Sequence, residues 1–333
     1  MTHRPTAVFA MDPVHLPQLF PAELMDRLHT LARIDPAVCV RDFAAPGAEL
    51  TEVEVLITGW GCPPIDDTAL AALPKLGAVL HTAGSVRALV GDAFWARDLP
   101  VSSAAHVNAL PVAEFTLAAI LFAAKDAFGA RHRYALTHRY PTSVETASVG
   151  AYRRRAGLIG ASRVGRRVLE LLRPFDFETL LHDPYLAPAE AAGLGARGVD
   201  LDELLATSDI VSLHAPDLPE TTNLLDRRRL ALIPDGGVFI NTARGALVDE
   251  RALTEELVSG RLRAVLDVTQ LEPLPADSPL YTLPNVFLTP HIAGSLGNEL
   301  ARLGANTVAE LERYRAGLPL QHRVDRADLA RVA

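Results

Sequence analysis

Short apolar runs that alternate with longer helical patterns are the feature of this sequence that most constrains its fold. Turn residues bound the runs, and helical patterns such as Glu23–Leu31 separate them. A short apolar run between turn signals is typical of a buried strand, and its alternation with helices is typical of parallel βαβ units. The first third of the chain is predicted to contain strands at Ala7–Met11, Val38–Arg41, Val53–Thr58, Ala78–Thr82 and near Val101.

The same alternation resumes after Arg154 and runs to His291. Strands are expected at Ala156–Ile159, Thr179–His182, Ile210–Leu213, Val238–Asn241, Ala264–Leu266 and Val286–Leu288. Helices are expected at Val164–Leu172, Leu201–Ala206 and Glu250–Ser259. This pattern predicts a doubly wound sheet that binds a nucleotide.

Two further helices are expected outside these repeats. An apolar helix is predicted from Pro111 to Phe128, with Pro111 in the first turn, where a missing N–H costs nothing. It resembles a hinge between two domains. A final helix near Asn298–Ala316 precedes a polar tail.

Composition narrows the class of protein. A length of 333 residues suggests two domains, and the excess of 40 acidic over 32 basic residues argues against nucleic acid as the main partner. Cys39 and Cys62 are too few for a disulfide framework or a zinc site, which favours a reducing cytoplasm and no metal. Glu114 interrupts the most apolar stretch, Val112–Ala124, so no membrane span is expected. The N-terminus lacks the apolar region of a signal peptide.

The segment from Gly157 to Gly165 is expected where a strand turns into a helix. It reads G-x-S-x-x-G from Gly160, with Ser162 where a dinucleotide fingerprint has its second glycine. That glycine normally lets the backbone approach the phosphates, which bind at the helix N-terminus. Serine keeps the side chain small and adds a hydroxyl that could donate to a phosphate.

Asp183 supports the fingerprint because it ends the next predicted strand. Asp183 follows Gly165 by 18 residues, close to the spacing of the acid that binds the ribose hydroxyls of the adenosine. A carboxylate there would repel a 2′-phosphate, so NAD is favoured over NADP. The alternative makes the glycines ordinary turn residues and Asp183 a cap before Pro184. The register of strand, helix and acid favours the cofactor site.

Three titratable or charged residues follow three successive predicted strands: Arg244, Glu272 and His291. Ligands of an open α/β sheet bind beyond the carboxyl ends of its strands, so these side chains are expected to converge. Arginine can hold a carboxylate and polarise a neighbouring carbonyl. Histidine can exchange a proton with the carbonyl oxygen as hydride arrives, and a nearby glutamate favours the imidazolium.

Each of the three also has a structural interpretation. Arg244 could form a surface ion pair, Glu272 could be a solvated loop acid, and His291 could be a loop histidine bonded to backbone. Their placement after consecutive strands favours the catalytic interpretation. Six other histidines show no comparable pattern and are interpreted as structural; they are His81, His106, His132, His138, His182 and His214.

These segments together resemble the D-isomer-specific 2-hydroxyacid dehydrogenase family. The resemblance is carried by the segments Leu158–Gly165, Asp183–Tyr185, Asp209–Pro216, Asn241–Gly245, Val248–Glu250, Leu266–Val268, Glu272–Pro275 and Thr289–Gly294. It implies Arg244 as the substrate-binding arginine, His291 as the acid/base and Glu272 as its partner. It further implies a cofactor site formed by Gly160, Ser162, Arg163, Val164, Gly165, Asp183, Thr242, Ala243, Asp267 and Gly294.

The resemblance also implies the domain organisation. A Rossmann NAD-binding domain at 105–295 would be inserted in a flavodoxin-like substrate domain at 1–104, with 296–333 returning to the latter and the active site in the cleft. Members usually dimerise through the nucleotide-binding domain, so a homodimer is expected, with a possible interface role for Pro111–Phe128.

The substrate domain departs more from the family. Where the family has a Gly-rich loop, this chain has Thr82–Arg87, and the amides of Ser85 and Val86 are expected to hold the substrate carboxylate. Trp60 and Gly61 are expected to line the pocket, although packing explains Trp60 equally well.

Three functions remain open at this point. The leading one is NAD-dependent reduction of a 2-oxoacid or oxidation of a D-2-hydroxyacid. An NADH-sensing binding protein, similar to the transcriptional corepressors that resemble this family, is the second. The third is oxidation of formate or phosphite, which would require a tight polar pocket.

Overall fold

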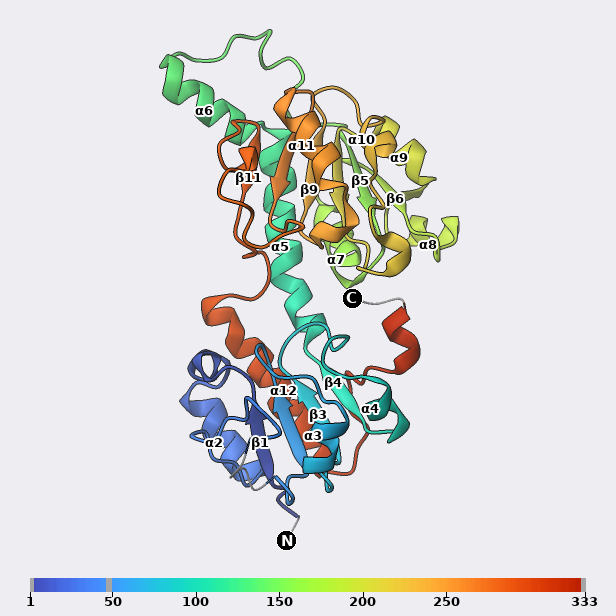
Figure 1. The fold of residues 1–333 in the computed structure, drawn as a ribbon. Coiled ribbons are helices and arrows are strands. Elements are labelled where there is room, and N and C mark those ends of the chain that lie inside the picture. Colours follow the sequence, from blue (N-terminus) through green and yellow to red (C-terminus); the bar gives the residue numbers. More distant parts are fainter. Residues whose placement is uncertain (1–2, 46–49, 331–333) are drawn as a thin grey trace. The chain divides into compact units, whose positions relative to one another are not determined.

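The chain forms two compact units in the computed structural model, which describes residues 3–45 and 50–330 (Figure 1). The first unit contains the residues up to Asn108 and those from Ser295 onward. The second unit runs from Ala109 to Gly294. Each unit is built around its own parallel sheet with helices on both faces, which confirms the predicted fold class.

The sheet of the first unit has four parallel strands in the order β1-β2-β3-β4. They are β1 (Ala7–Ala10), β2 (Val55–Thr58), β3 (Ala78–His81) and β4 (Val101–Ser103), and all their residues are buried. Successive residues of β1 enter opposite cores, Phe9 on one face and Val8 on the other. This alternation is what a sheet covered on both faces requires.

The predicted strand at Val38–Arg41 is wrong in extent. Only Cys39 bridges to the sheet, beside Phe9 on the outer edge of β1. Turns limit the pairing on both sides: the carboxylate of Asp35 accepts from Ala37 N at 2.9 Å and that of Asp42 from Ala44 N at 2.8 Å. Such local side-chain to backbone bonds compete with a sheet ladder.

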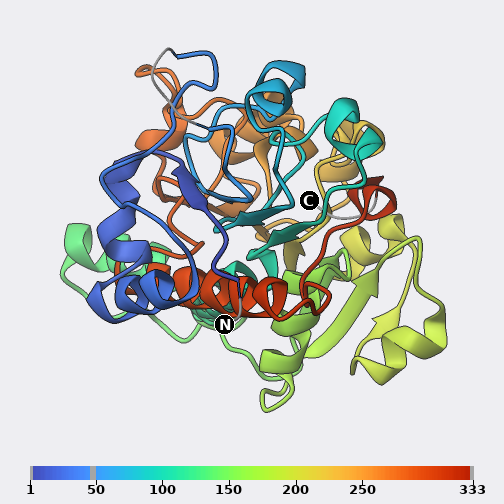
Figure 2. The ribbon, with the colours of Figure 1, turned by 90° about the horizontal axis from the view of Figure 1, so that it is seen from below.

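The C-terminal helix covers one face of this sheet. The helices of the unit are α1 (Leu16–Leu19), α2 (Ala22–Leu31), α3 (Asp67–Ala72), α4 (Asp92–Ala96) and α12 (Leu300–Arg315). Figure 2 shows α12 lying beside α1 and α2, although it follows them by most of the chain. The contact is close because Gly304 faces the Leu19 carbonyl, where a Cβ would lie 1.8 Å from the oxygen.

The second unit has a seven-stranded parallel sheet in the order β11-β10-β9-β8-β5-β6-β7. Its strands are β5 (Arg155–Ile159), β6 (Glu178–His182), β7 (Arg197–Gly198), β8 (Ile210–Leu213), β9 (Val238–Asn241), β10 (Arg263–Leu266) and β11 (Val286–Leu288). The strand order reverses between β5 and β8, which is where a doubly wound sheet binds its ligand. The short strand β7 was not predicted.

Capping residues begin several helices of this unit. The helices that connect its strands are α7 (Arg163–Leu172), α8 (Pro188–Gly193), α9 (Leu201–Thr207), α10 (Arg227–Leu230) and α11 (Glu250–Val258). Asp226 caps α10 through Arg229 N at 2.8 Å, and Asp249 caps α11 through Ala252 N at 3.0 Å. These side chains satisfy N–H groups that have no partner inside the helix.

The predicted helix at Pro111–Phe128 is wrong at both ends. Helix α5 spans Ala105–Ala124 and contains Pro111 in its interior, and α6 (Ala127–Thr137) follows it. The break lies at Asp126, whose backbone is left-handed with φ 48°. Pro111 lacks the N–H of one helical hydrogen bond, yet the helix continues through it, and the residue is buried.

Helix α5 is also more apolar than expected. Within the described chain it is long and apolar enough to cross a membrane by length and composition, and half of its most apolar window is buried inside the structure. The prediction that Glu114 would exclude such a segment is therefore wrong. A buried core helix has the same composition, so the test does not identify a membrane span.

Replacing Gly304 by alanine tests the contact between α12 and α1. The added methyl would collide with the Leu19 carbonyl, so we expect the free energy of unfolding to fall by about 1–3 kcal/mol. The measurement is chemical denaturation followed by circular dichroism. Gly91→Ala is the control, because no atom lies within 4 Å of its added Cβ. Equal effects of the two variants would contradict the packing described.

Candidate active site

The glycine loop after β5 is tightly packed at two positions. Gly160 has φ +99°, and a Cβ there would lie 2.7 Å from Ala215 N. A Cβ on Gly165 would lie 2.1 Å from the Gly160 carbonyl oxygen. Only glycine fits at position 160 or 165. These glycines allow a tight turn from β5 into α7, and the N-terminus of α7 lies at the carboxyl edge of the sheet.

Ser162 explains why the second glycine of the fingerprint is dispensable here. Its backbone is extended, with φ −63° and ψ 177°, so a side chain causes no strain. Its hydroxyl oxygen caps α7 by accepting from Gly165 N at 3.3 Å. The predicted donation of this hydroxyl to a phosphate stays a prediction. Arg163, which is exposed, and Val164 open the helix.

Asp183 lies directly beside this loop. One carboxylate oxygen accepts from Ala161 N at 2.7 Å and the other from Tyr185 N at 2.9 Å. The side chain is half-buried at the carboxyl end of β6, next to the strand that carries the glycines. The carboxylate is therefore held at the loop rather than turned into solvent.

Glu272 and His291 form a hydrogen-bonded pair. His291 Nδ1 lies 2.8 Å from Glu272 Oε2, and Glu272 Oε1 accepts from Thr269 N at 3.2 Å. The His291 side chain is 48% exposed and that of Glu272 is 40% exposed, so a ligand can reach both. Because Nδ1 faces the glutamate, Nε2 is the atom left to exchange a proton.

Asp267 holds the turn that presents His291. Its buried carboxylate accepts from Thr289 Oγ1 at 2.6 Å, from Ile292 N at 2.8 Å and from Ala293 N at 2.9 Å. Its carbonyl also accepts from His291 N at 2.9 Å. His291 has the left-handed φ of 54°, which is uncommon for a residue with a Cβ, and these bonds on both sides fix it.

Arg244 is placed by the turn that ends β9. The Asn241 side chain donates to the Arg244 carbonyl at 2.9 Å and accepts from Ala243 N at 3.0 Å. The exposed Arg244 side chain bends back, and its guanidinium donates to the Ala243 carbonyl at 2.6 Å. Sequence reasoning missed Asn241 as the residue that shapes this turn.

The Arg244 and Glu272 loops are in direct contact. A Cβ on Gly245 would lie 2.1 Å from the carbonyl carbon of Thr269, so these two backbones touch. Thr269 is the residue whose N–H binds Glu272. The structure thus joins Glu272 to His291 and brings the loop of Arg244 against that of Glu272.

The residues predicted for a nicotinamide pocket lie at the same sheet edge. Thr242 is buried, with its hydroxyl 2.9 Å from that of Thr116 on α5. Ala243 precedes Arg244, and Gly294 follows the turn that is bound to Asp267. Both residues are half-buried. The carboxylate of Asp267 is occupied by its own chain, so its predicted contact with the cofactor stays a prediction.

The predicted substrate residues of the first unit follow β2 and β3. Ser103 Oγ donates to the Gly84 carbonyl and Ala104 N donates to the Ala83 carbonyl at 3.0 Å, which fixes the loop that carries Ser85 and Val86. Ser85 is exposed and the Val86 side chain is buried. Trp60 is 37% exposed.

Two histidines near these loops are buried and uncharged. His81 ends β3 and lies 2.9 Å from Thr58 Oγ1, and burial lowers its pKa to about 4. His214 lies behind the glycine loop, with Nε2 2.9 Å from Ser212 Oγ, and burial lowers its pKa to about 3. These low pKa values support the structural interpretation of both histidines. A histidine that is neutral at pH 7 has no proton of an imidazolium to give as an acid.

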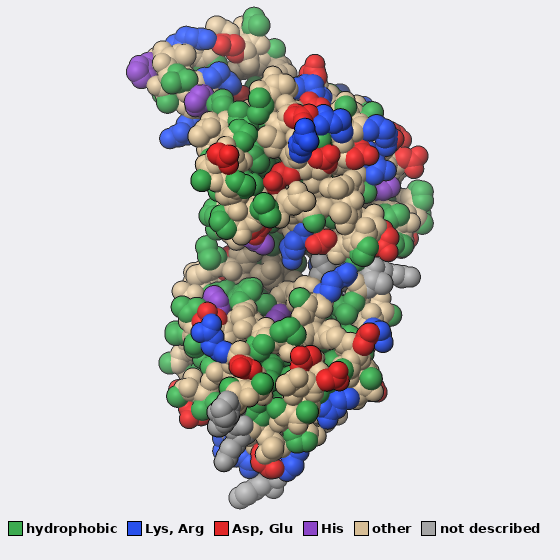
Figure 3. Space-filling model, in the orientation of Figure 1, with side chains coloured by type: hydrophobic (Ala, Val, Ile, Leu, Met, Phe, Trp, Pro, Cys, Tyr) green, Lys and Arg blue, Asp and Glu red, His purple; other side chains and the backbone are tan. Residues whose placement is uncertain are grey.

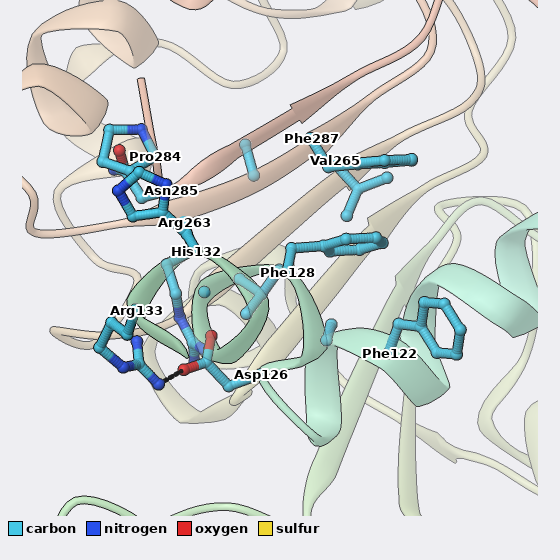
Figure 4. Close-up of a pocket in the computed structure, with 14 residues that line it drawn as sticks. Phe122, Asp126, Phe128, His132, Arg133, Arg263, Val265, Pro284, Asn285 and Phe287 are labelled. Carbon is cyan, nitrogen blue, oxygen red and sulfur yellow. Dashed lines mark hydrogen bonds and ion pairs between the residues drawn. The ribbon is translucent and has the colours of Figure 1, made fainter. Parts of the chain in front are cut away.

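The cavity drawn in Figure 4 lies away from these residues. It has a volume of about 210 Å³ and is lined by α5, α6 and the first residues of β9 and β10. Asp126 lies at its edge, paired with Arg133 at 2.7 Å and Arg263 at 2.8 Å. Because it adjoins the amino ends of the strands, it is not the crevice in which a doubly wound sheet binds its cofactor.

Charges of both signs are interspersed on the face shown in Figure 3. Many are paired, such as Arg227 with Glu255 at 2.6 Å and Arg228 with Asp202 at 2.7 Å. Among the described residues, no group of three or more His, Cys, Asp and Glu side chains could hold a metal ion.

Comparison with known proteins identifies the family. The profile described as "D-isomer specific 2-hydroxyacid dehydrogenase, NAD binding domain" matches residues 117–293. The chain belongs to the D-isomer specific 2-hydroxyacid dehydrogenase family. The matched part is the NAD-binding domain, so the predicted family and nicotinamide cofactor are confirmed.

Curated relatives are about a third identical to the chain over the aligned residues. It is 35% identical over 76% of its length to a D-3-phosphoglycerate dehydrogenase from Mycobacterium tuberculosis, covering 48% of that protein. A hydroxypyruvate reductase from Blautia hydrogenotrophica is 35% identical over 49% of the chain and 51% of that protein. A mitochondrial formate dehydrogenase from Solanum tuberosum is 31% identical over 67% of the chain and 59% of that protein. The chain spans about half the length of the first curated relatives it matches.

Solved structures of the family resemble the whole chain. A phosphoglycerate oxidoreductase from Rhizobium etli superposes with a TM-score of 0.80 at 25% identity, covering 97% of this chain and 99% of that one. A D-isomer specific 2-hydroxyacid dehydrogenase from Xanthobacter autotrophicus, in complex with NADPH and MES, gives 0.75 at 28% identity and covers 97% and 98%.

The buried histidines predict how stability changes with pH. An unfolded histidine titrates near pH 6.5, whereas folded His81 titrates near 4. As the pH falls between these values, the unfolded chain binds a proton that the folded chain does not. The free energy of unfolding should therefore fall by up to about 1.4 kcal/mol per pH unit for this group.

Denaturation of the His81→Gln variant between pH 7 and 4 checks this prediction. Its slope against pH should be smaller than that of the unaltered protein by about one proton. The control variant His29→Gln, at an exposed position on α2, should keep the full slope. Equal slopes in all three proteins would show that His81 is not buried in the neutral form.

Proposed function

We propose that the protein is an NAD-dependent oxidoreductase that transfers hydride between nicotinamide and C2 of a D-2-hydroxyacid or 2-oxoacid. The observation that carries the proposal is the 2.8 Å contact between His291 and Glu272, with the Arg244 loop packed against that of Glu272. The family supports the same reaction class. Residues 109–294 would bind the cofactor, and the first unit would bind the substrate.

The second unit fits a dinucleotide. The turn of Gly160 and Gly165 has no room for side chains, which leaves backbone N–H groups at the start of α7 accessible to a pyrophosphate. Arg163 and Ser162 stand at the same helix end and would add donors. Asp183 would accept from the ribose hydroxyls. The bound cofactor would supply or accept the hydride.

Arg244 would bind and polarise the substrate. Its planar guanidinium can donate to the carboxylate and the C2 oxygen together, which fixes the C2 face that is presented for reaction. The amides of Ser85 and Val86 would hold the same carboxylate from the first unit. Among the described residues, neither amide has a hydrogen-bond partner within the protein.

His291 would move the proton. In reduction Nε2 donates to the C2 oxygen as that oxygen gains charge, and in oxidation it accepts the proton from the hydroxyl. Glu272 accepts from Nδ1, which fixes the ring orientation and stabilises the imidazolium in the reductive direction.

Replacing His291 by alanine tests this role. Loss of the acid/base should lower turnover by roughly a hundredfold or more, because proton transfer contributes on that scale. NADH binding, measured by fluorescence, should change little. His29→Ala provides the control at an exposed site on α2. Turnover that survives in His291→Ala would exclude His291 as the acid/base.

The choice of NAD over NADP depends on Asp183. Its carboxylate would repel a 2′-phosphate, so Asp183→Asn should shift the ratio of kcat/KM for NADPH to that for NADH upward by roughly tenfold, the effect of about 1.4 kcal/mol. Steady-state kinetics with both cofactors measures it. Glu178→Gln, an exposed acid on the same strand, serves as the control. An unaltered ratio would contradict the proposal.

The protein would act as a homodimer in the cytoplasm. Helix α6 has no buried residue among its described positions, and only its beginning packs on its own unit, where Phe128 stacks on Phe287 at 4.0 Å. Its far end projects from the unit in Figure 1. A helix of 11 residues is marginal in water without a packing partner. Its exposed Tyr134 and Leu136, with Phe122 on α5, offer an apolar surface to a second copy. Both cysteines are free thiols, as in a reducing compartment.

Light scattering after size-exclusion chromatography tests the dimer. The unaltered protein should have twice the chain mass of 35.8 kDa, and Leu136→Asp should shift it toward the monomer. Val258→Asp, at a similarly exposed position on α11, should leave the mass unchanged. A monomeric unaltered protein would overturn this part of the proposal.

A further inference from the structure

Two aromatic rings meet at the carboxyl edge of the first unit's sheet. Trp60 follows β2 and His15 follows β1, and their ring centroids lie 5.4 Å apart at an angle of 61°. Edge-to-face contacts of this kind are favourable. The sequence predicts that Trp60 lines the substrate pocket, whereas His15 has no role in the proposed reaction.

The backbone around the two rings is fixed. Asp12 N donates to the Trp60 carbonyl at 2.7 Å, and Gly61 has the left-handed φ of +80°, with Asp12 at 3.0 Å from its position for a Cβ. The Asp12 side chain accepts from Val14 N at 3.2 Å and begins the 3-10 helix Pro13–His15. The ring of Trp60 is therefore presented from an ordered turn rather than from a free loop.

This turn lies against the loop proposed to hold the substrate carboxylate. A Cβ on Gly59 would be 2.7 Å from Thr82 Oγ1, and that hydroxyl donates to the Thr58 carbonyl at 2.8 Å. Thr82 opens the segment that leads to Ser85. The next group of a substrate held at Ser85 would therefore lie toward Trp60.

The turns around Trp60 contain no lysine or arginine. This holds for the described turns Met11–His15 and Gly59–Cys62, in which Val14, next to His15 in the chain, is 68% exposed. Arg87, on the loop that follows β3, donates to the carbonyl of Leu329. A phosphate or second carboxylate bound here would lack the charge-assisted donors that such groups require.

Within the second unit, the residues proposed to be catalytic have exposed apolar neighbours. Leu271, next to Glu272, is 59% exposed, and Ile292, next to His291, is 37% exposed. Large apolar side chains left accessible beside reactive groups are typical of a site that binds an apolar ligand.

From these contacts we propose that Trp60 and His15 form the subsite for the substrate side chain, and that this side chain is bulky and uncharged, with an aryl group favoured. The proposal rests on the proposed 2-oxoacid chemistry and adds its substrate class. The aryl group of such a substrate would pack against Trp60 and His15 while the substrate carboxylate stays at Ser85. Phosphorylated and dicarboxylic 2-oxoacids would be poor substrates.

Steady-state kinetics with purified full-length protein and NADH tests the preference. The kcat/KM for phenylpyruvate should exceed that for 3-phosphohydroxypyruvate and for 2-oxoglutarate by at least about tenfold. In Trp60→Ala the ratio of kcat/KM for phenylpyruvate to that for glyoxylate should fall at least about tenfold, and Trp60→Phe should restore most of it. Trp95→Phe, at the only other tryptophan, is the control. A higher kcat/KM for the phosphorylated acid would overturn the subsite. An unchanged ratio of kcat/KM for phenylpyruvate to that for glyoxylate in Trp60→Ala would do the same.

A binding measurement separates this proposal from the reaction itself. In Trp95→Phe the remaining tryptophan is Trp60, so its fluorescence reports directly on the subsite. D-phenyllactate added in the presence of NAD should change this fluorescence saturably, whereas D-3-phosphoglycerate should not. Binding without turnover of any acid would retain the subsite and reject the proposed function. Turnover of small acids without this signal would reject the subsite alone.

Discussion

Parallel pairing of β9, β10 and β11 is the constraint on which the candidate site depends. Asn241, Leu266 and Leu288 are register partners and also the last residues of their strands, so the three strands end level. Each chain segment must then leave the sheet at the same edge. Arg244 and His291, which are far apart in the sequence, therefore leave the sheet at the same edge.

Asp267 converts this convergence into a defined geometry. A buried carboxylate is costly unless donors satisfy it, and here Thr289 and two backbone N–H groups do so. The same bonds hold His291 in a left-handed conformation that its side chain disfavours, with Nδ1 directed at Glu272. One acid thus satisfies its own burial requirement and orients the group proposed to transfer the proton.

Sequence patterns predicted the strands well because buried strands of a parallel sheet need apolar runs, and the run at Ile210–Leu213 matches β8 fully. Local patterns failed where tertiary packing decides, as at Pro111, which lies inside a helix that other elements cover. The anchoring role of Asp267 also escaped prediction, because its partners lie on a loop that follows another strand. For Ser162, the sequence showed the departure and the structure supplies its reason, a helix cap in an unstrained backbone.

The most direct test of the central claim is the loss of NADH absorbance when the purified protein meets a panel of 2-oxoacids, from glyoxylate to oxaloacetate and phenylpyruvate. The proposed reaction predicts turnover of at least one of them, with NADH favoured over NADPH. No loss of absorbance with any acid of the panel, while fluorescence shows that NADH binds, would contradict it. The cofactor site would then serve another purpose, with formate or phosphite oxidation and NADH sensing as the functions to test.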